Sequence, residues 1–190
     1  MSGPYTIPNL LTAIRIAFIP AIVVLFYLPY HWSDMACGVV FGLVGITDAF
    51  DGYLARKLGQ VSRLGAFLDP VADKLIVVTA LVLIVSKNPI WYVTLTAAVI
   101  IGREIAISAL REWMATIGAH HKMRVSGVAK FKTIVQIVGL SMMLFREDLF
   151  GLPIYAFGLV LTVAAAALTL WSMITYLIAA GPELRGSRET

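Results

Sequence analysis

Four aspartates form two closely spaced pairs within an otherwise apolar stretch of the chain. Asp48 and Asp51 are three residues apart and Asp69 and Asp73 are four apart, so on helices each pair shares one face. Four carboxylates brought together in a low-dielectric environment repel one another and require cations. Hard oxygen donors in this number suit Mg²⁺ or Mn²⁺, and with substrate phosphates they could hold two ions. The four aspartates therefore predict a two-metal centre for phosphoryl transfer.

The composition indicates which kind of protein must position these carboxylates. Of the 190 residues, 59% are hydrophobic and 14% are charged, and the mean hydropathy is +0.87. Soluble domains carry about 25% charged residues, and 190 residues are too few to enclose so much apolar surface in one core. These values exclude a soluble domain, a disordered chain, collagen and a coiled coil. We expect one all-α integral membrane domain that comprises residues 1–190.

Uncharged stretches separated by turn residues predict six transmembrane helices. Asn88-Pro89 is one such break, and Ser33 or Asp34 could cap the helix that follows the first turn. Residues 7–15 could form a short interfacial helix before the first span. Glycines at helical spacing predict a close helix contact on the second span, at Gly38, Gly42 and Gly45. The six expected helices comprise roughly residues 10–28, 34–57, 65–86, 90–114, 126–145 and 152–179.

The distribution of lysine and arginine predicts how these helices are oriented. If the N-terminus is inside, the inner loops and tail hold ten Lys and Arg residues, whereas the outer loops hold only Lys87 and Arg146. This excess predicts that both termini are cytoplasmic and that the chain lies in the cytoplasmic membrane. The net charge of +4 then reflects basic loops beside anionic lipid, and we expect no nucleic-acid partner.

The four aspartates lie at matching depths in the second and third expected helices. All four fall within nine residues of the predicted cytoplasmic turn, residues 57–64. Each would cost about 2.5–3.5 kcal/mol or more at the bilayer centre, so such residues persist when they line a wet cavity, pair with other charges or bind ions. A single aspartate would more often cap a helix or pair with a nearby arginine or lysine. Four at one depth favour a functional cluster.

The segment from Asp48 to Asp73 resembles the signature of the CDP-alcohol phosphotransferase family, D-x2-D-G-x2-A-R-x8-G-x3-D-x3-D, at every fixed position. The resemblance implies a membrane enzyme with six transmembrane helices, two divalent metal ions at its cytoplasmic side and a homodimeric assembly. Such enzymes transfer a phosphatidyl or similar phosphoryl group from a CDP-linked donor to an alcohol and release CMP.

The resemblance also implies a role for each matching residue. Asp48, Asp51 and Asp69 would be metal ligands, and Asp73 would be the catalytic base and also a metal ligand. Arg56 could form a bidentate contact with a diphosphate, and the small residues beside it leave room for a nucleotide, although close helix packing would use them too. The expected contacts with CDP-diacylglycerol are Pro8, Asn9, Gly52, Ala55, Arg56, Ser62 and Gly65.

Outside the signature, the likeness is to bacterial members of the family whose acceptor is sn-glycerol 3-phosphate, and it covers about residues 5 to 180. It rests on Ile7–Thr12 with Arg15, on Arg103–Ile105 with Ser108–Trp113, and on Gly127, Lys130, Lys132 and Thr133. A phosphorylated acceptor needs cations besides the metal ions. We expect its phosphate to contact Arg103, Arg111, Lys130 and Lys132.

Several alternatives stay open from the sequence. Arg103 could pair with Glu104 or a lipid headgroup instead, and Lys130 and Lys132 could merely set the topology. The same chemistry could serve another acceptor, such as inositol phosphate, serine or phosphatidylglycerol. A cation transporter would also use intramembrane aspartates, but here all four lie toward one side, with none predicted to continue a path outward.

Overall fold

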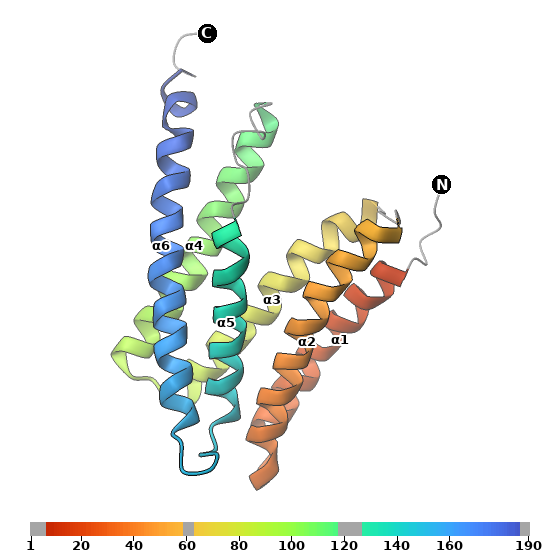
Figure 1. The fold of residues 1–190 in the computed structure, drawn as a ribbon, viewed down its shortest axis with the longest axis vertical. Helices are drawn as coiled ribbons and strands as arrows, with labels where there is room; N and C mark the ends of the chain where they lie inside the picture. Colours follow the sequence, from red (N-terminus) through yellow and green to blue (C-terminus); the bar gives the residue numbers. More distant parts are fainter. Residues whose placement is uncertain (1–6, 59–62, 118–126, 187–190) are drawn as a thin grey trace.

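The computed structural model describes residues 7–58, 63–117 and 127–186, and the side chains of residues 12–47, 65, 67–117, 131–178 and 181. Over these ranges the chain is all-α, and its β structure is limited to a bridge between Leu149 and Leu152. The expected helical fold is confirmed there. The six helices in the described ranges are α1 (Ile7–Tyr27), α2 (His31–Leu58), α3 (Arg63–Lys87), α4 (Trp91–Thr116), α5 (Gly127–Phe145) and α6 (Ile154–Gly186) (Figure 1).

Two helix starts differ from the expectation for local reasons. The helix α1 is continuous from Ile7 through Pro20 to Tyr27, so residues 7–15 form its first turns and not a separate interfacial helix. The helix α2 begins at His31, so Ser33 lies within its first turn and does not cap it. The buried Ser33 hydroxyl instead donates to the carbonyl oxygens of Leu28 and Tyr30, at 2.9 and 2.7 Å, and closes the turn between α1 and α2.

The last helix is longer than expected. The expected helix comprises residues 152–179, but α6 continues through Pro182 to Gly186 and is 33 residues long. A proline within a helix removes one backbone hydrogen bond, and the helical path can continue on both sides of it. The helix therefore extends past the bundle at the end where the chain terminates (Figure 1).

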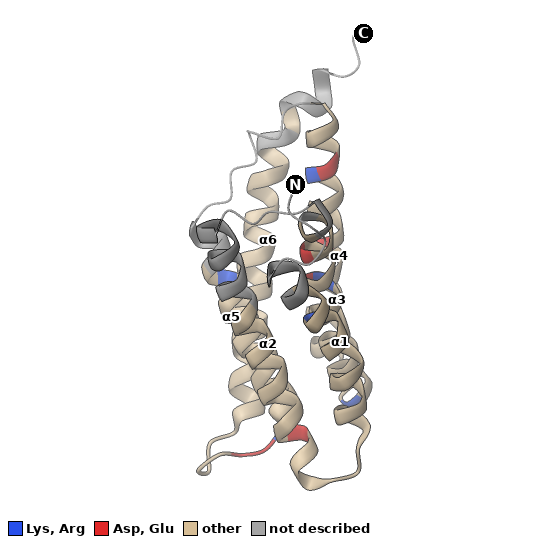
Figure 2. Cartoon of the chain, turned by 90° about the vertical axis from the view of Figure 1, so that its right-hand side faces the viewer, with Lys and Arg blue, Asp and Glu red and all other residues tan. Residues whose placement is uncertain are grey.

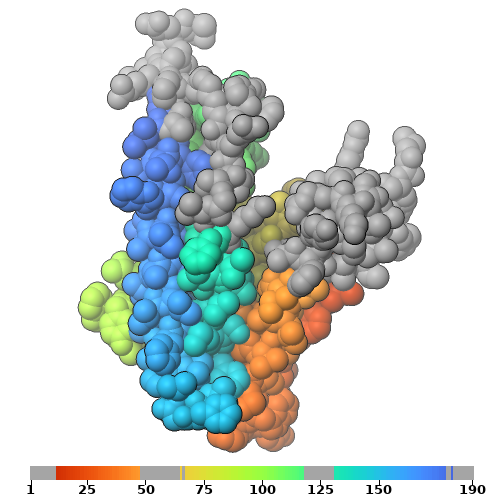
Figure 3. Space-filling model, viewed as in Figure 1, coloured from red at the N-terminus to blue at the C-terminus, as the bar shows by residue number. Residues whose placement is uncertain are grey.

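The helices form two groups that meet at one end and diverge at the other (Figure 1). In one group α1 packs against both α2 and α3, and in the other α6 packs against both α4 and α5. The groups contact each other through α2 with α5 and through α3 with α4 and α5. Buried apolar side chains from both groups form one core, which includes Phe26, Phe41, Ile84, Ile100 and Leu144. Figure 3 shows the contact between the two groups in a space-filling view, with α2 against α5.

Three glycines of α2 bring it close to α5, which confirms the contact expected from their spacing. A Cβ atom on Gly38 would lie 2.6 Å from the backbone nitrogen of Phe145, and one on Gly42 would lie 2.8 Å from Ser141 Oγ. The Ser141 hydroxyl donates to the Gly38 carbonyl at 2.8 Å. We call this contact the glycine seam; its α2 residues are Gly38, Gly42 and Gly45, and its α5 residues are Phe145, Ser141 and Ile137.

Ion pairs join the helices at the end where the two groups meet. Asp34 accepts a hydrogen bond from Lys87 at 2.8 Å, and Arg146 Nε lies 3.7 Å from its other carboxylate oxygen. The Lys87 ammonium also lies 4.4 Å from the centre of the Phe26 ring. The cations expected in the outer loops therefore share one carboxylate at one end of the bundle. Figure 2 shows these charges separated from those in the upper half by a stretch without charged residues.

The exterior of the bundle is apolar. Among the described residues two helical segments are long and apolar enough to cross a bilayer, Trp91–Thr116 and Ile154–Ile178, and shorter apolar segments comprise Thr12–Tyr27 and Phe131–Phe145. Large hydrophobic side chains on several helices face outward and include Val24, Leu43, Val82, Leu95, Val160 and Ile178. A soluble monomer rarely exposes so much contiguous apolar surface, whereas a bilayer accommodates it.

The glycine seam predicts the effect of adding a single methyl group. Gly38→Ala would place its Cβ against the backbone of α5, which cannot move aside, so we expect the free energy of unfolding to fall by about 1–3 kcal/mol. The matched control is Gly102→Ala on α4, where no atom lies within 4 Å of the added Cβ. Thermal unfolding of both variants in one detergent measures the difference. Equal melting temperatures would contradict the close contact.

Candidate active site

Two of the four signature aspartates have described side chains, and both receive hydrogen bonds from α1. Thr12 Oγ1 donates to Asp69 Oδ1, and Arg15 Nη1 donates to Asp73 Oδ1 at 2.5 Å. The donors are one turn apart on α1 and the acceptors one turn apart on α3, in the same order along the chain. The two helices therefore run in the same direction here, with these carboxylates on the side of α3 that faces α1.

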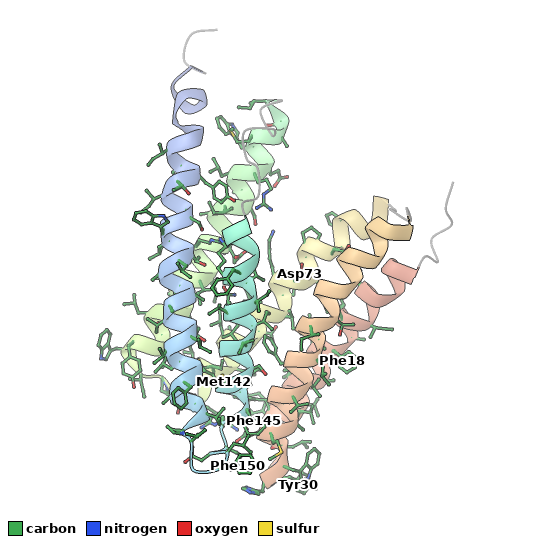
Figure 4. The ribbon with its side chains drawn as sticks, viewed as in Figure 1. Phe18, Tyr30, Asp73, Met142, Phe145 and Phe150 are labelled. Atoms are coloured by element: carbon green, nitrogen blue, oxygen red, sulfur yellow. The ribbon has the colours of Figure 1, made fainter. Side chains whose placement is uncertain are left out.

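Figure 4 places Asp73 on α3 where the two helix groups begin to separate, and Asp69 lies one turn before it on the same helix. Arg15 is 4% exposed, whereas the side chain of Asp73 is 45% exposed. The guanidinium thus approaches the carboxylate from the protein interior and leaves much of it accessible. An accessible carboxylate can bind a cation or accept a proton from a bound molecule.

Asp48 and Asp51 lie on the last part of α2, and their side chains are outside the described residues. Residues 59–62 join α2 to α3, so the Cα atoms of Leu58 and Arg63 are at most about 18 Å apart. Among the described side chains, no three His, Cys, Asp or Glu residues form a group that could hold a metal ion. The described donors nevertheless fit a hard divalent cation, because Asp69 and Asp73 supply carboxylate oxygens from successive turns of one helix.

The residues expected to contact the nucleotide are described to different extents. Gly65 is buried on α3, one turn before Asp69. The side chains of the other six lie outside the described residues: Pro8 and Asn9 are in the first turns of α1, Gly52, Ala55 and Arg56 are in the last turns of α2, and Ser62 is outside the described chain.

The cations expected to bind the acceptor phosphate lie in different environments. Arg103 on α4 is 7% exposed and donates to Glu104 through Nη1, which is the pairing that the sequence left open. Its Nε is buried without a hydrogen-bond partner in the described part of the chain. Arg111, two turns further along α4, is exposed. No hydrogen bond or ion pair between described side chains joins either arginine to Asp69 or Asp73.

Lys132 is buried between two helices. It lies on α5, is 5% exposed, and its ammonium donates to Ser172 Oγ of α6 at 2.8 Å. The Ser172 hydroxyl in turn lies 2.9 Å from the carbonyl oxygen of Thr169, to which it donates. Lys130 lies in the first turn of α5, and its side chain is outside the described residues. Of the four expected cations, Arg103 and Lys132 are therefore buried and already bonded to neighbouring side chains.

Comparison with known proteins identifies the family to which this arrangement belongs. The CDP-alcohol phosphatidyltransferase family matches residues 5–174, which include all four aspartates and both of their described α1 partners. The chain belongs to the CDP-alcohol phosphatidyltransferase family.

Individual relatives match over nearly the full length of both chains. A protein of Salmonella choleraesuis (strain SC-B67) is 49% identical over 180 residues, which are 95% of this chain and 97% of the relative. Proteins of Escherichia coli (strain K12) and Shigella flexneri serotype 5b are 49% and 48% identical over the same shares. Each is named CDP-diacylglycerol–glycerol-3-phosphate 3-phosphatidyltransferase.

Sequence reasoning did not assign a function to Thr12 or Arg15 in this CDP-alcohol phosphatidyltransferase. A signal for them exists in the heptad-like spacing of α1, where Thr12 and Arg15 continue a stripe of apolar residues formed by Ile19, Ile22 and Phe26. An arginine in such a stripe is expensive to bury unless it has an anionic partner. The stripe predicts that a partner exists, but the identity of the partner requires the packing of α1 on α3.

The hydrogen bond between Lys132 and Ser172 predicts how substitution of Ser172 changes the free energy of unfolding. Ser172→Ala removes the hydroxyl that accepts from a buried ammonium, so we expect the free energy of unfolding to fall by about 1–3 kcal/mol. The double variant Lys132→Met with Ser172→Ala replaces both polar groups and should recover most of that loss. Melting temperatures in detergent compare the two. A double variant that is no more stable than Ser172→Ala would contradict this account.

Proposed function

We propose that this chain transfers the phosphatidyl group of CDP-diacylglycerol to sn-glycerol 3-phosphate, and that the products are phosphatidylglycerol phosphate and CMP. The observation that carries the proposal is the identity of 48–49% over 95% of the chain to proteins named for this reaction. The signature between Asp48 and Asp73 supports the phosphoryl-transfer chemistry independently of those names. The reaction belongs to phospholipid biosynthesis.

In the proposed site, Asp48, Asp51 and Asp69 hold two divalent cations, Mg²⁺ or Mn²⁺, with Asp73 as a further ligand. When bound, the ions would neutralise the diphosphate of the donor and the CMP that leaves. The chain contributes carboxylates from two helices joined by a short connection, residues 59–62. The nucleotide would lie against Gly52, Ala55 and Gly65, where small side chains leave room, with contacts to the remaining expected residues Pro8, Asn9, Arg56 and Ser62.

Asp73 is the proposed general base. It accepts the proton from the 1-hydroxyl group of glycerol 3-phosphate as the oxygen of that group attacks the β-phosphorus of CDP-diacylglycerol. The new phosphorus–oxygen bond replaces the bond to CMP, which departs with the bonding electron pair. The 45% exposure of Asp73 supports this role, because a base has to reach its substrate within about 3 Å.

The acceptor phosphate is proposed to bind among Arg103, Arg111, Lys130 and Lys132. Arg103 carries the strongest structural support, because its Nε is a buried donor without a partner in the described part of the chain. A guanidinium can donate to a phosphate through one edge while another edge holds Glu104. Binding of an anionic phosphate would supply the partner that Nε lacks.

We also propose that all six helices cross the cytoplasmic membrane of a bacterium, with both termini and the active site at the cytoplasmic side, and that the chain acts as a homodimer. The excess of lysine and arginine in the loops on one side supports this orientation. The helices are 19 to 33 residues long, compared with about 20 residues that a bilayer core requires. The meeting of Lys87 and Arg146 at Asp34 is consistent with a shared outer end.

The release of CMP by the purified chain tests the proposal. With CDP-diacylglycerol and Mg²⁺, we expect release with sn-glycerol 3-phosphate and none with inositol 1-phosphate, serine, phosphatidylglycerol or without an acceptor. Release with a different acceptor only would retain the family chemistry and refute the proposed substrate. If folded protein supplied with the metal ion released no CMP with any acceptor, the proposed activity would be wrong.

Asp73→Asn tests the proposed base. An amide cannot accept the hydroxyl proton, so we expect kcat to fall by about 10²- to 10⁴-fold. Asp148→Asn, in the exposed connection between α5 and α6, is the matched control and should keep wild-type activity. Both variants should elute as folded protein in size-exclusion chromatography in detergent. A kcat near the wild-type value in Asp73→Asn would remove the assignment.

A further inference from the structure

The first helix supplies described hydrogen-bond donors to two aspartates of the signature. We propose that Thr12 and Arg15 are positioning residues, and that they fix the carboxylates of Asp69 and Asp73 in the orientations that the reaction requires. This inference rests on the proposed function, since it assigns Asp69 to metal binding and Asp73 to proton transfer. Thr12 and Arg15 lie outside the signature and outside the contacts proposed above for donor and acceptor.

Burial shows that both residues act through the aspartates. Thr12 is 2% exposed and Arg15 is 4% exposed, whereas the side chain of Asp73 is 45% exposed. A substrate can therefore reach the carboxylate of Asp73 but not the guanidinium behind it. The Arg15 side chain holds Oδ1 from the interior at 2.5 Å and restrains rotation of the carboxylate. Thr12 holds Oδ1 of Asp69 in the same way.

The core fixes the position of these donors along the chain. On α1, Ile22 and Phe26 lie in the core on the stripe that begins with Thr12 and Arg15. On α3, Ile76 and Ala80 are buried in the same core, one and two turns beyond Asp73. A slip of either helix by one turn, about 5.4 Å, would separate both hydrogen-bonded pairs at once. The apolar packing thus sets the register that aligns two donors with two acceptors.

Loss of the Arg15–Asp73 contact and loss of the Thr12–Asp69 contact should affect different measured quantities. Arg15 adds a positive charge beside the carboxylate cluster, so its removal leaves the cluster more negative and should not weaken cation binding. The loss should appear in kcat, because the proposed base is no longer oriented. Thr12 is uncharged and orients a proposed metal ligand, so its loss should appear as weaker cation binding.

Arg15→Gln is compared with Arg146→Gln, which removes an arginine from an interhelical ion pair at the opposite end of the bundle. We expect Arg15→Gln to lower kcat by about 10- to 100-fold, with KM for both substrates within about threefold and Mn²⁺ affinity unchanged or tighter. Arg15→Lys, which keeps the charge without the planar guanidinium, should recover part of the activity. Arg146→Gln should keep the wild-type kcat.

Thr12→Val is compared with Thr12→Ser, which retains the hydroxyl group. Mn²⁺ binding is measured by electron paramagnetic resonance of the free ion. We expect Thr12→Val to weaken this binding by about tenfold or more, and Thr12→Ser to bind Mn²⁺ almost as the wild type does. Melting temperatures of all variants in detergent serve as the folding control. This titration requires no turnover and no lipid substrate.

The outcomes separate the positioning role from the proposed function. If Arg15→Gln folds and keeps the wild-type kcat, or loses kcat only in proportion to weaker Mn²⁺ binding and a lower melting temperature, the positioning role of Arg15 is wrong. If Arg15→Gln does not fold, Arg15→Lys is judged by the same criteria. If the wild type shows no turnover with any acceptor, the proposed function fails, and the Mn²⁺ titrations of the Thr12 variants then decide the positioning role of Thr12.

Discussion

A carboxylate within an apolar helix bundle has to be stabilised by donors that the bundle itself supplies, and the apolar packing of α1 on α3 brings two such donors to two carboxylates. Asp69 and Asp73 lie on α3, and the side chains that bond to them come from α1. The arginine cannot be buried in α1 without an anionic partner, and the aspartates gain orientation from having a partner. Each helix therefore carries polar residues that the other helix helps to stabilise.

The facing sides of α1 and α3 change from apolar to polar along the length of the two helices. Near the meeting point of the two groups, their facing stripes are apolar and contribute Phe26, Ile22 and Ile84 to the core. Toward the diverging end, the stripes become polar at Thr12, Arg15, Asp69 and Asp73. The glycine seam holds α2 against α5 over the apolar part, at Gly38, Gly42 and Gly45. Close packing at one end of the bundle thus accompanies divergence of the two groups at the other, and Asp73 lies where they begin to separate (Figures 1 and 4).

The sequence was sufficient for the elements and for the family, because both depend on local patterns. Runs without charge and the Asn88-Pro89 break placed most helix ends within a few residues, and the spacing of Gly38, Gly42 and Gly45 predicted a close helix contact. The end of α6 was predicted seven residues too early, because the helix continues through Pro182 into the charged segment that follows it.

Partners between helices were harder to predict because they depend on register. The sequence left three partners open for Arg103, namely the acceptor phosphate, Glu104 and a lipid headgroup, and its bond to Glu104 became clear only with the structure. The bonds from Thr12 and Arg15 join residues 57 and 58 positions apart, a separation at which sequence patterns carry no information about contact. The proposed roles of Asp48, Asp51, Arg56 and Lys130 concern side chains outside the described residues, so the structure leaves them as predictions.

The long separation between Arg15 and Asp73 has a consequence for how the chain is made. On the proposed topology, α1 would enter the membrane before α3 has been made, so the new helix would carry its arginine without the carboxylate that later receives it. A lone arginine near the centre of a spanning helix costs about 2.5–3.5 kcal/mol on insertion scales. The first helix accordingly reaches its final environment only when the third arrives, 58 residues later. On the proposed function, the pairing of Arg15 with Asp73 would thus matter both for the assembly of the helices and for the reaction.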